Sequence, residues 1–366
     1  MNFEHEAFKP ETLPLRTNRV DTAIFFDALI DACSVFEVYK TKINDSKLNK
    51  FWFLPTLQQK EALASSMLEG TQATLDGVLV DQVAPDNKDK NLIEIRNYDR
   101  ASLFGYKYLS RDDFNGDLIL ELHKRIMGDT ARRNVDEIGV YRKKQNYIGK
   151  TNKTHEITYT PPTYEDVPEL IENLLAYINK PMDTLRPLVR TAIIHAQFET
   201  IHPFLDGNGR VGRILIPLYL YYTKQIDLPC FFISEALERD KMKYYTLLNN
   251  TRSRGQWSEW IKFFLDTVTV QCTKYINIIS KINSLFEEHI KIACTLARSN
   301  QINELVNLLY KYPIINTVTV AKETKIPPAS INRYLNLLAE NGILYTDNKS
   351  RNRTFFYYDL MNILRE

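Results

Sequence analysis

The residue types best suited to chemistry are concentrated in one run, HPFLDGNGRVGR, from His202 to Arg213. The segment Gly207–Gly209 lies between two expected helices, and its glycines let consecutive backbone N–H groups face one concavity. The helix that follows contributes unpaired N–H groups and the positive end of its dipole. Arg210 and Arg213 share one helix face, where their guanidinium groups can bind polyphosphate oxygens. The run therefore predicts a phosphate-binding site.

Two further side chains of this run could act on a bound nucleotide. Asp206 lies at the mouth of the glycine segment and is the natural Mg²⁺ ligand, because magnesium at a nucleotide takes one or two carboxylates plus phosphate oxygens. His202 lies four residues upstream and is the best general base of the run, because imidazole titrates near neutral pH. A base, a metal ligand and an anion-binding loop so close together predict phosphoryl or nucleotidyl transfer.

Two other interpretations of these residues are weaker. The segment Gly207–Gly212 matches the G-x-G-x-x-G pattern, with Asp227 about twenty residues further on. A dinucleotide site requires a preceding strand, whereas a helix is expected here. His195 and His202 could face one side of a helix as metal ligands, but no third ligand is evident. We therefore expect His195 to be a packed or hydrogen-bonded helix residue; a helix–loop–helix turn with chance charges is the bland alternative.

Helical periodicity dominates the elements that must position this run. A strongly apolar helix is expected from Pro187 to about Ile201, and a second begins near Arg210. Residues 139–162 combine short apolar segments with polar turn residues, which predicts a β-hairpin, and residues 81–91 are expected to form a loop. Further helices are expected at 57–76, 91–109, 116–128, 164–179, 234–250 and 258–297.

The C-terminal residues change character. Helices followed by two strands resemble a winged helix-turn-helix. Residues 298–366 contain nine Lys or Arg and six Asp or Glu, fewer basic residues than a dedicated DNA-binding domain usually has. A protein-interaction or dimer scaffold is therefore favoured. DNA contact stays open through Asn332, Arg333, Lys349, Arg351 and Arg353. The expected helices are 301–310, 317–326 and 328–341, and the expected strands are 342–345 and 353–357.

The composition is that of an ordinary globular protein. The chain has 366 residues, 44% of them hydrophobic and 25% charged, with a net charge of +2 that forces neither a nucleic-acid nor a membrane partner. No run of about 18 apolar residues predicts a membrane span. The first residues lack the pattern of a signal peptide. The scattered cysteines indicate reduced thiols, so a cytoplasmic protein is expected. These cysteines are Cys33, Cys230, Cys272 and Cys294.

The run from His202 to Arg213 resembles, without a mismatch, the H-x-F-x-D/E-G-N-G-R-x-x-R signature of Fic-domain proteins. The resemblance implies a mainly α protein with an all-helical Fic core, a β-hairpin flap and a C-terminal winged helix-turn-helix. It also implies a division of the chain. The expected parts are an N-terminal Fic-associated segment at 1–94, the core at 95–265, a connecting helix at 266–297 and the winged helix at 298–366.

The resemblance implies a protein adenylyltransferase, which transfers AMP from ATP to Ser, Thr or Tyr hydroxyls of target proteins and of itself. His202 would deprotonate the hydroxyl, Asp206 would hold Mg²⁺, and Arg213 would contact the γ-phosphate. The remaining expected nucleotide contacts in this run are Gly207, Asn208, Gly209, Arg210, Val211 and Gly212.

A second element of the sequence agrees with this resemblance. Residues Ser65–Gly70 fit the S/T-x-x-x-E-G/N pattern of the inhibitory helix that family members often carry. Its implied role is a salt bridge from Glu69 to Arg213. A carboxylate there would compete with the γ-phosphate for the same guanidinium.

The resemblance also implies where the substrates lie. The flap at Gln145–Gly149 would hold an extended target segment by strand addition, unless it is an ordinary surface hairpin. Asn249 would hydrogen-bond the adenosine and Tyr244 would pack on the adenine, although both could be packing residues. A homodimer is expected as well.

Three other functions stay open. The same site could remove AMP, with Glu69 positioning a water molecule. It could instead transfer UMP, phosphocholine or phosphate, although an obstructive Glu69 is meaningful mainly where a γ-phosphate must fit. The chain could also be a DNA-binding regulator with a vestigial Fic core, against which the intact His202, Asp206 and Arg213 argue.

Overall fold

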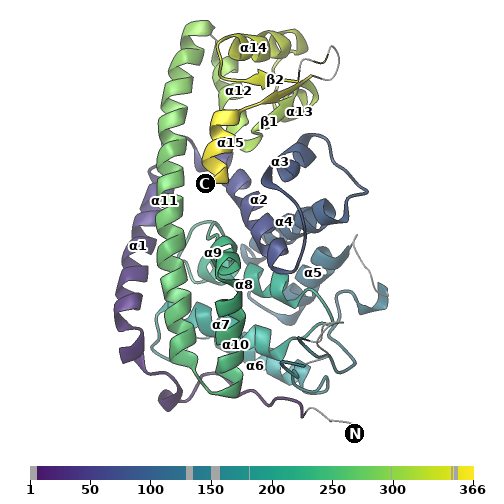
Figure 1. Cartoon of the computed structure of the whole chain (residues 1–366), viewed down its shortest axis with the longest axis vertical. Helices are drawn as coiled ribbons and strands as arrows, with labels where there is room; N and C mark the ends of the chain where they lie inside the picture. The colour runs from purple at the N-terminus through teal and green to yellow at the C-terminus, as the bar shows by residue number, and fades with distance from the viewer. Residues whose placement is uncertain are drawn as a thin grey trace. The chain divides into compact units, whose positions relative to one another are not determined.

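The computed structural model describes residues 6–128, 135–149, 157–180, 182–297, 299–347, 349 and 353–366. The chain is mainly α-helical, as expected, with one small three-stranded sheet (Figure 1). The α-helices are α1 (Phe26–Asn44), α2 (Lys50–Leu68), α3 (Leu75–Val83), α4 (Lys90–Leu109), α5 (Gly116–Met127), α6 (Val167–Asn179), α7 (Pro187–Ile201), α8 (Asn208–Tyr222), α9 (Ser234–Arg239), α10 (Lys241–Ser253), α11 (Trp257–Leu296), α12 (Asn300–Lys311), α13 (Thr317–Glu323), α14 (Pro328–Glu340) and α15 (Tyr358–Arg365). The strands are β1 (Ile314–Asn316), β2 (Tyr345–Thr346) and β3 (Thr354–Phe356).

Two compact units make up the chain, and they interleave in sequence. The first unit contains residues 96–271, close to the predicted core at 95–265, and it also contains Ala64–Thr71 with the expected inhibitory residue Glu69. The division into four parts along the sequence stays a prediction. The first unit comprises Met1–Ser34, Ala64–Thr71 and Arg96–Gln271, and the second comprises Val35–Leu63, Gln72–Ile95 and Cys272–Glu366.

The centre of the first unit is α7. Pro187 occupies its first turn, where a proline loses no helical hydrogen bond, and every residue from Leu188 to Ile201 is buried. Because it is buried on all sides, the helix belongs to the core. Helices α6, α8 and α10 pack against it, and α5 packs against α8 (Figure 1). The loop between α7 and α8, which carries the signature, is therefore fixed at both ends.

The second unit contains the C-terminal elements and α3. Its sheet has the order β1-β3-β2, and both pairs are antiparallel, with Phe356 of β3 opposite both Ile314 and Tyr345. The three expected helices are present as α12, α13 and α14, and the two expected strands are present but shorter, as β2 and β3. The winged-helix assignment stays a prediction, and Arg351 lies outside the described residues. Strand β1 and helix α15, both short, were not predicted from the sequence.

Three local expectations were wrong in detail. The helix expected at 57–76 ends at Leu68, because Gly70 has a φ of 91° and stops the helix. The loop expected at 81–91 begins later, because Asp81 is buried within α3 and its Oδ1 accepts a 2.8 Å bond from the Asp86 N–H. The helix expected at 234–250 is broken at Asp240, between α9 and α10.

The expected hairpin at 139–162 contains a single bridge, between Ile148 and Tyr159, and residues 150–156 lie outside the described part. Within the described residues, no helix has the combination of length and hydropathy needed to span a bilayer.

Candidate active site

His202 occupies an unusual backbone position directly after α7. Its φ is 50°, which only a few per cent of non-glycine residues adopt, and its N–H bonds to Phe198 O at 3.0 Å. Backbone strain of this kind persists where the surrounding fold imposes it, often at functional sites. Burial, together with the charges of Arg252 and Arg142, lowers the pKa of His202 to about 3. The imidazole is therefore neutral at pH 7, the state that a general base requires before it takes a proton.

The loop after His202 is closed by the side chain of Asn208. Its Oδ1 accepts from the Phe204 N–H and its Nδ2 donates to Phe204 O, each at 2.8 Å. Asn208 is 2% exposed, so its amide shapes the loop, and its expected side-chain contact with phosphate stays a prediction. Gly207, with a φ of 78°, caps α8 without a side-chain hydrogen bond. The first N–H groups of α8 therefore have no side-chain acceptor from their cap, as an anion-binding helix N-terminus requires.

Asp206 is exposed at the mouth of this loop. Its Oδ1 accepts a 2.7 Å bond from the Gly207 N–H. In the described part of the chain, no group of three or more His, Cys, Asp or Glu side chains could hold a metal ion.

His123 on α5 packs against the same loop. Its ring stacks on Phe204 with the centroids 3.8 Å apart and an angle of 3° between the planes. The Gly139 N–H donates to its Nδ1 at 3.0 Å, so Nε2 carries the proton and donates to Asp206 O at 3.1 Å. Burial lowers the pKa of His123 to about 4, which keeps this tautomer neutral. The ring thus joins the signature loop to the segment that leads into the flap.

The predicted ion pair between Glu69 and Arg213 is present. Glu69 Oε1 lies 2.7 Å from Arg213 NH2, and the guanidinium is fully buried. The same side chain bonds Ser65, from Nε to Oγ at 2.7 Å and from NH2 to the backbone O at 2.8 Å. Burial raises the pKa of Glu69, but the charge of Arg213 and its hydrogen bond outweigh that effect, and the pKa lies below its ordinary value. The end of α2 is therefore anchored on the second arginine of the signature.

Gly209 permits this close approach. A Cβ atom there would lie 2.2 Å from Glu69 Oε1 and 2.8 Å from Arg213 NH1. Arg210 is 5% exposed, and its NH2 lies 3.5 Å from Met127 Sδ. The side chain of Val211 is fully buried, and a Cβ at Gly212 would lie 2.4 Å from Glu199 Oε1. The structure thus places Val211 and Gly212 in the helix packing behind the loop.

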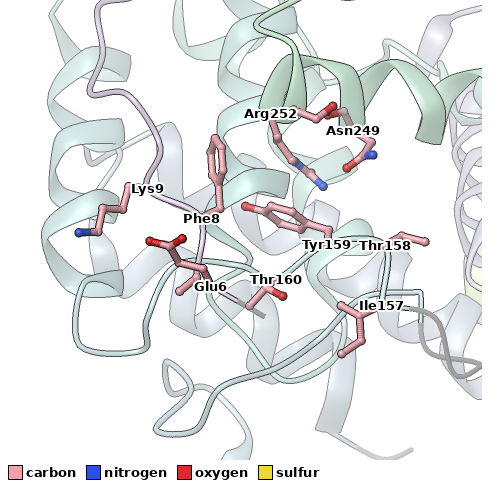
Figure 2. A pocket seen from close by; sticks show the side chains of 11 residues that line it. Glu6, Phe8, Lys9, Ile157, Thr158, Tyr159, Thr160, Asn249 and Arg252 are labelled. Atoms are coloured by element: carbon pink, nitrogen blue, oxygen red, sulfur yellow. The ribbon is translucent and has the colours of Figure 1, made fainter. Parts of the chain in front are cut away.

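Two further expected residues differ in their surroundings. Tyr244 is 1% exposed, and its hydroxyl lies 2.9 Å from Nε2 of His195, whose Nδ1 lies 3.1 Å from Gly212 O. His195 is therefore a packed, hydrogen-bonded helix residue, as expected. The surroundings of Tyr244 favour the packing alternative over adenine contact. Asn249 instead lines a pocket of about 500 Å³ between residues 6–9, residues 157–160 and α10 (Figure 2).

Arg252 of α10 is one of the residues that line this pocket. Figure 2 shows it pointing towards Tyr159, and its guanidinium carbon lies 4.0 Å from the centre of that ring. Its Nε donates to Thr200 Oγ1 at 3.1 Å, and the Tyr159 hydroxyl donates to Thr200 O at 2.7 Å. The Phe8 N–H donates to Thr160 O at 3.0 Å, so the N-terminal segment extends the flap by one backbone bond. The pocket is thus walled by residues 6–9, residues 157–160 and α10.

The base of the flap is tied to the signature by Arg142. Its Nε donates to His202 O at 3.0 Å, its N–H to Pro203 O at 2.9 Å and its NH2 to Pro162 O at 2.5 Å. Asn146, inside the expected target-binding segment, donates from Nδ2 to Phe204 O at 3.1 Å. The flap and the signature loop are thus held side by side.

Residues 113–220 match the Fic/DOC family, and residues 40–107 match the N-terminal part of the same family. Over these two stretches the chain is similar to the Fic family. Protein adenylyltransferase Fic of Drosophila mojavensis is 32% identical over 208 residues, which are 56% of this chain and 36% of that protein. Protein adenylyltransferase fic-1 of Caenorhabditis elegans is 35% identical over 112 residues, which are 30% of this chain and 20% of that protein. The matches thus span 36% or less of these curated relatives.

Solved Fic structures share the fold. A Fic family protein from Desulfovibrio desulfuricans has a TM-score of 0.59 at 20% identity, covering 96% of this chain and 98% of that one. Residues 134–508 of C. elegans Fic-1 give a TM-score of 0.53 at 20% identity, covering 71% of this chain and 74% of that one.

Residues that position the Fic signature include four that sequence reasoning did not single out. Three of them, His123, Arg142 and Arg252, lie far from the signature in the sequence, and no local pattern singled them out. Glu199 lies only three residues before His202, and a carboxyl group in the last turn of a helix rich in apolar residues is a signal that could have been used. The four residues are His123, Arg142, Glu199 and Arg252.

Proposed function

We propose that this chain is a protein adenylyltransferase that transfers AMP from ATP to hydroxyl groups of target proteins and of itself. The observation that carries the proposal is the loop after α7, which combines the neutral His202, the uncapped N-terminus of α8 and the buried Arg213. The matched relatives bear the name protein adenylyltransferase, which supports the same chemistry.

The reaction follows from these groups. Nε2 of His202 accepts the proton of the target hydroxyl, because Nδ1 faces the backbone O of Glu199 at 3.3 Å. The hydroxyl oxygen attacks the α-phosphorus of ATP, the bond from that phosphorus to the bridging oxygen breaks, and pyrophosphate leaves. The first N–H groups of α8 and the arginines of the signature hold the phosphates in place.

Asp206 fits the role of a magnesium ligand. Its carboxylate is exposed at the loop mouth, next to the helix N-terminus where phosphates would lie. Mg²⁺ would supply charge neutralisation on the phosphates when it is bound. With a single carboxylate at this position, metal affinity should depend on the nucleotide.

We propose that Glu69 inhibits the enzyme. Its Oε1 forms an ion pair with NH2 of Arg213 at 2.7 Å. A γ-phosphate can therefore take this position on the guanidinium only after Glu69 has moved. ATP bound without Arg213 would hold its α-phosphate out of line for attack.

The adenosine is proposed to lie towards the pocket lined by Asn249 and Arg252. An amide and a guanidinium next to the Tyr159 ring offer both hydrogen bonds and stacking to a purine nucleoside. The target segment is proposed to lie along the flap at Gln145–Gly149, which Asn146 and Arg142 hold against the signature loop.

A homodimer and a DNA contact through the C-terminal elements are further proposals. Asn332 and Arg333 are exposed on α14, and Arg333 also packs on its neighbour Tyr334 with 4.8 Å between the guanidinium carbon and the ring centre. A gel-shift titration over salt concentration tests the DNA contact, since phosphate contacts weaken steeply with salt. Light scattering tests the dimer.

The decisive experiment compares two labels. The Glu69→Gly variant is incubated with cell lysate and ATP labelled at either the α- or the γ-phosphorus. AMP transfer predicts protein labelling from α-labelled ATP alone, and the additional substitution His202→Ala should remove it. Labelling from γ-labelled ATP would indicate phosphate transfer instead, and no labelling from either would contradict the proposal.

A further inference from the structure

Glu199 is a buried carboxyl group that the chemistry above does not use. It lies in the last turn of α7, is 7% exposed, and its Oε1 has no hydrogen-bond partner among the described residues. Buried polar atoms are nearly always paired, because leaving one without a partner costs stability. A purely structural glutamate at this position would therefore be a poor choice, which points to a role in function.

The geometry relates Glu199 to the catalytic base. The left-handed backbone of His202 turns its ring back over the preceding helical turn. Nδ1 of His202 then lies 3.3 Å from the backbone O of Glu199 and 4.0 Å from its carboxylate Oε2. The first distance allows a hydrogen bond, and the second is that of an ion pair. Both groups are acceptors, so Nδ1 carries the proton and the lone pair is on Nε2.

Charged groups from three other elements face the same carboxyl. Arg213 of α8 and Arg252 of α10 favour its ionised form, whereas Glu69 at the end of α2 opposes it. Burial is the largest effect, and the pKa of Glu199 rises to about 7. The hydroxyls of Tyr244 and Tyr245 on α10 also lie within its field. The carboxyl therefore changes charge in the pH range in which the enzyme would work.

We propose that Glu199 is a positioning residue for His202, whose ionised carboxylate stabilises the imidazolium that forms when the base takes the target's proton. The inference rests on the proposed AMP transfer. The proton passes from the target hydroxyl to Nε2 of His202, Nδ1–H stays directed at Glu199, and the new positive charge faces the carboxylate. No proton moves to Glu199. When AMP has been transferred, the proton on Nε2 is lost to water.

This role explains why a carboxylate is present at position 199 although burying its charge destabilises the fold. Burial and two arginines make His202 hard to protonate, so the transition state needs a nearby anion. Glu69 also favours the imidazolium, but in the proposed mechanism it has moved away from Arg213. Glu199 then remains as the carboxylate beside Nδ1.

The test uses the full chain carrying Glu69→Gly, so that transfer is not obstructed. Glu199→Gln and Glu199→Asp are added to it, with Glu169→Gln on the exposed face of α6 as a matched control. AMP transfer is measured between pH 5.5 and 8.5, and ATP binding is measured by calorimetry.

The parent and the Glu169 variant should lose kcat as pH falls through the pKa of Glu199. Glu199→Gln should lose about tenfold in kcat and lose this acid limb, with KM for ATP changed by less than about twofold. Glu199→Asp should keep the acid limb of the pH profile of kcat.

The outcomes separate the two proposals. If the parent transfers no AMP, the proposed function fails and this inference fails with it. If the parent transfers AMP and Glu199→Gln matches it in kcat and in pH profile, only the role of Glu199 is overturned. If Glu199→Gln does not fold, the pH limb of Glu199→Asp decides, and its absence overturns the role.

Discussion

NH2 of Arg213 lies 2.7 Å from Oε1 of Glu69 and 2.8 Å from the backbone O of Ser65. One nitrogen of the guanidinium thus binds both the carboxylate and the helix that carries it. Nε of Arg213 bonds the Ser65 hydroxyl, while NH1 has no hydrogen-bond partner among the described residues. Glu69 Oε1 also lies against Gly209 at the start of α8, so a phosphate that binds there would have to replace Glu69, whereas the contacts with Ser65 could stay.

Glu69→Gly should raise AMP transfer, by about tenfold to 100-fold, because ATP can then bind with its α-phosphate aligned for attack. Arg213→Ala should not reproduce this gain. It breaks the same ion pair but also removes the partner of the γ-phosphate. The measurement is labelling of the chain itself and of lysate proteins from α-labelled ATP, with wild type, both single variants and the double variant side by side.

Simple loosening of the end of α2 would have a different result. In that case both substitutions activate, so a gain with Arg213→Ala would contradict the proposed competition. Equal labelling by wild type and Glu69→Gly would remove the inhibitory role from Glu69.

His202→Ala in the Glu69→Gly background should lower transfer by at least about 100-fold. ATP binding should survive, because it depends on backbone N–H groups and arginines rather than on the imidazole. Calorimetry with ATP and label transfer measure the two properties separately. Retention of most transfer activity would exclude His202 as the base.

Asp206→Ala should abolish transfer even at saturating ATP, and EDTA should abolish it in the parent. The reason is that one exposed carboxylate and the nucleotide phosphates would supply the metal's anionic ligands. Without ATP, calorimetry should detect only weak Mg²⁺ binding. Full activity in EDTA would rule out the metal.

Glu199→Gln should stabilise the fold at alkaline pH. Folding raises the pKa of this carboxyl from 4.5 to about 7. Such a group does not lower the free energy of unfolding at a pH below its unfolded-state pKa, and it lowers it most at a pH above its folded-state pKa. The gain in unfolding free energy should therefore approach about 3 kcal/mol at pH 8 and stay under about 1 kcal/mol at pH 5. Urea unfolding followed by tryptophan fluorescence at both pH values measures it. An equal effect at the two pH values would show that the ionised carboxylate is not destabilising.

The chemistry of the signature could be predicted from sequence because its parts are consecutive in the chain. His202, Asp206 and the segment Gly207–Arg213 lie on one loop and one helix start, so local backbone rules bring them together. The ion pair of Glu69 with Arg213 spans 144 residues, and only the resemblance to the Fic family predicted it. The long helices were predictable as well, because each presents many apolar residues at helical spacing.

Tertiary structure alone decided the surroundings of these groups. His123 and Arg142 reach the signature loop across 83 and 60 residues respectively, which no local pattern encodes. The exposure of Asn249 to the pocket and the burial of Tyr244 on the same helix depend on what packs against α10. The charge states of His202 and Glu199 depend on burial and on arginines from other helices. A sequence specifies which groups can titrate, but the pKa of each is determined by the desolvation and the neighbouring charges that folding creates.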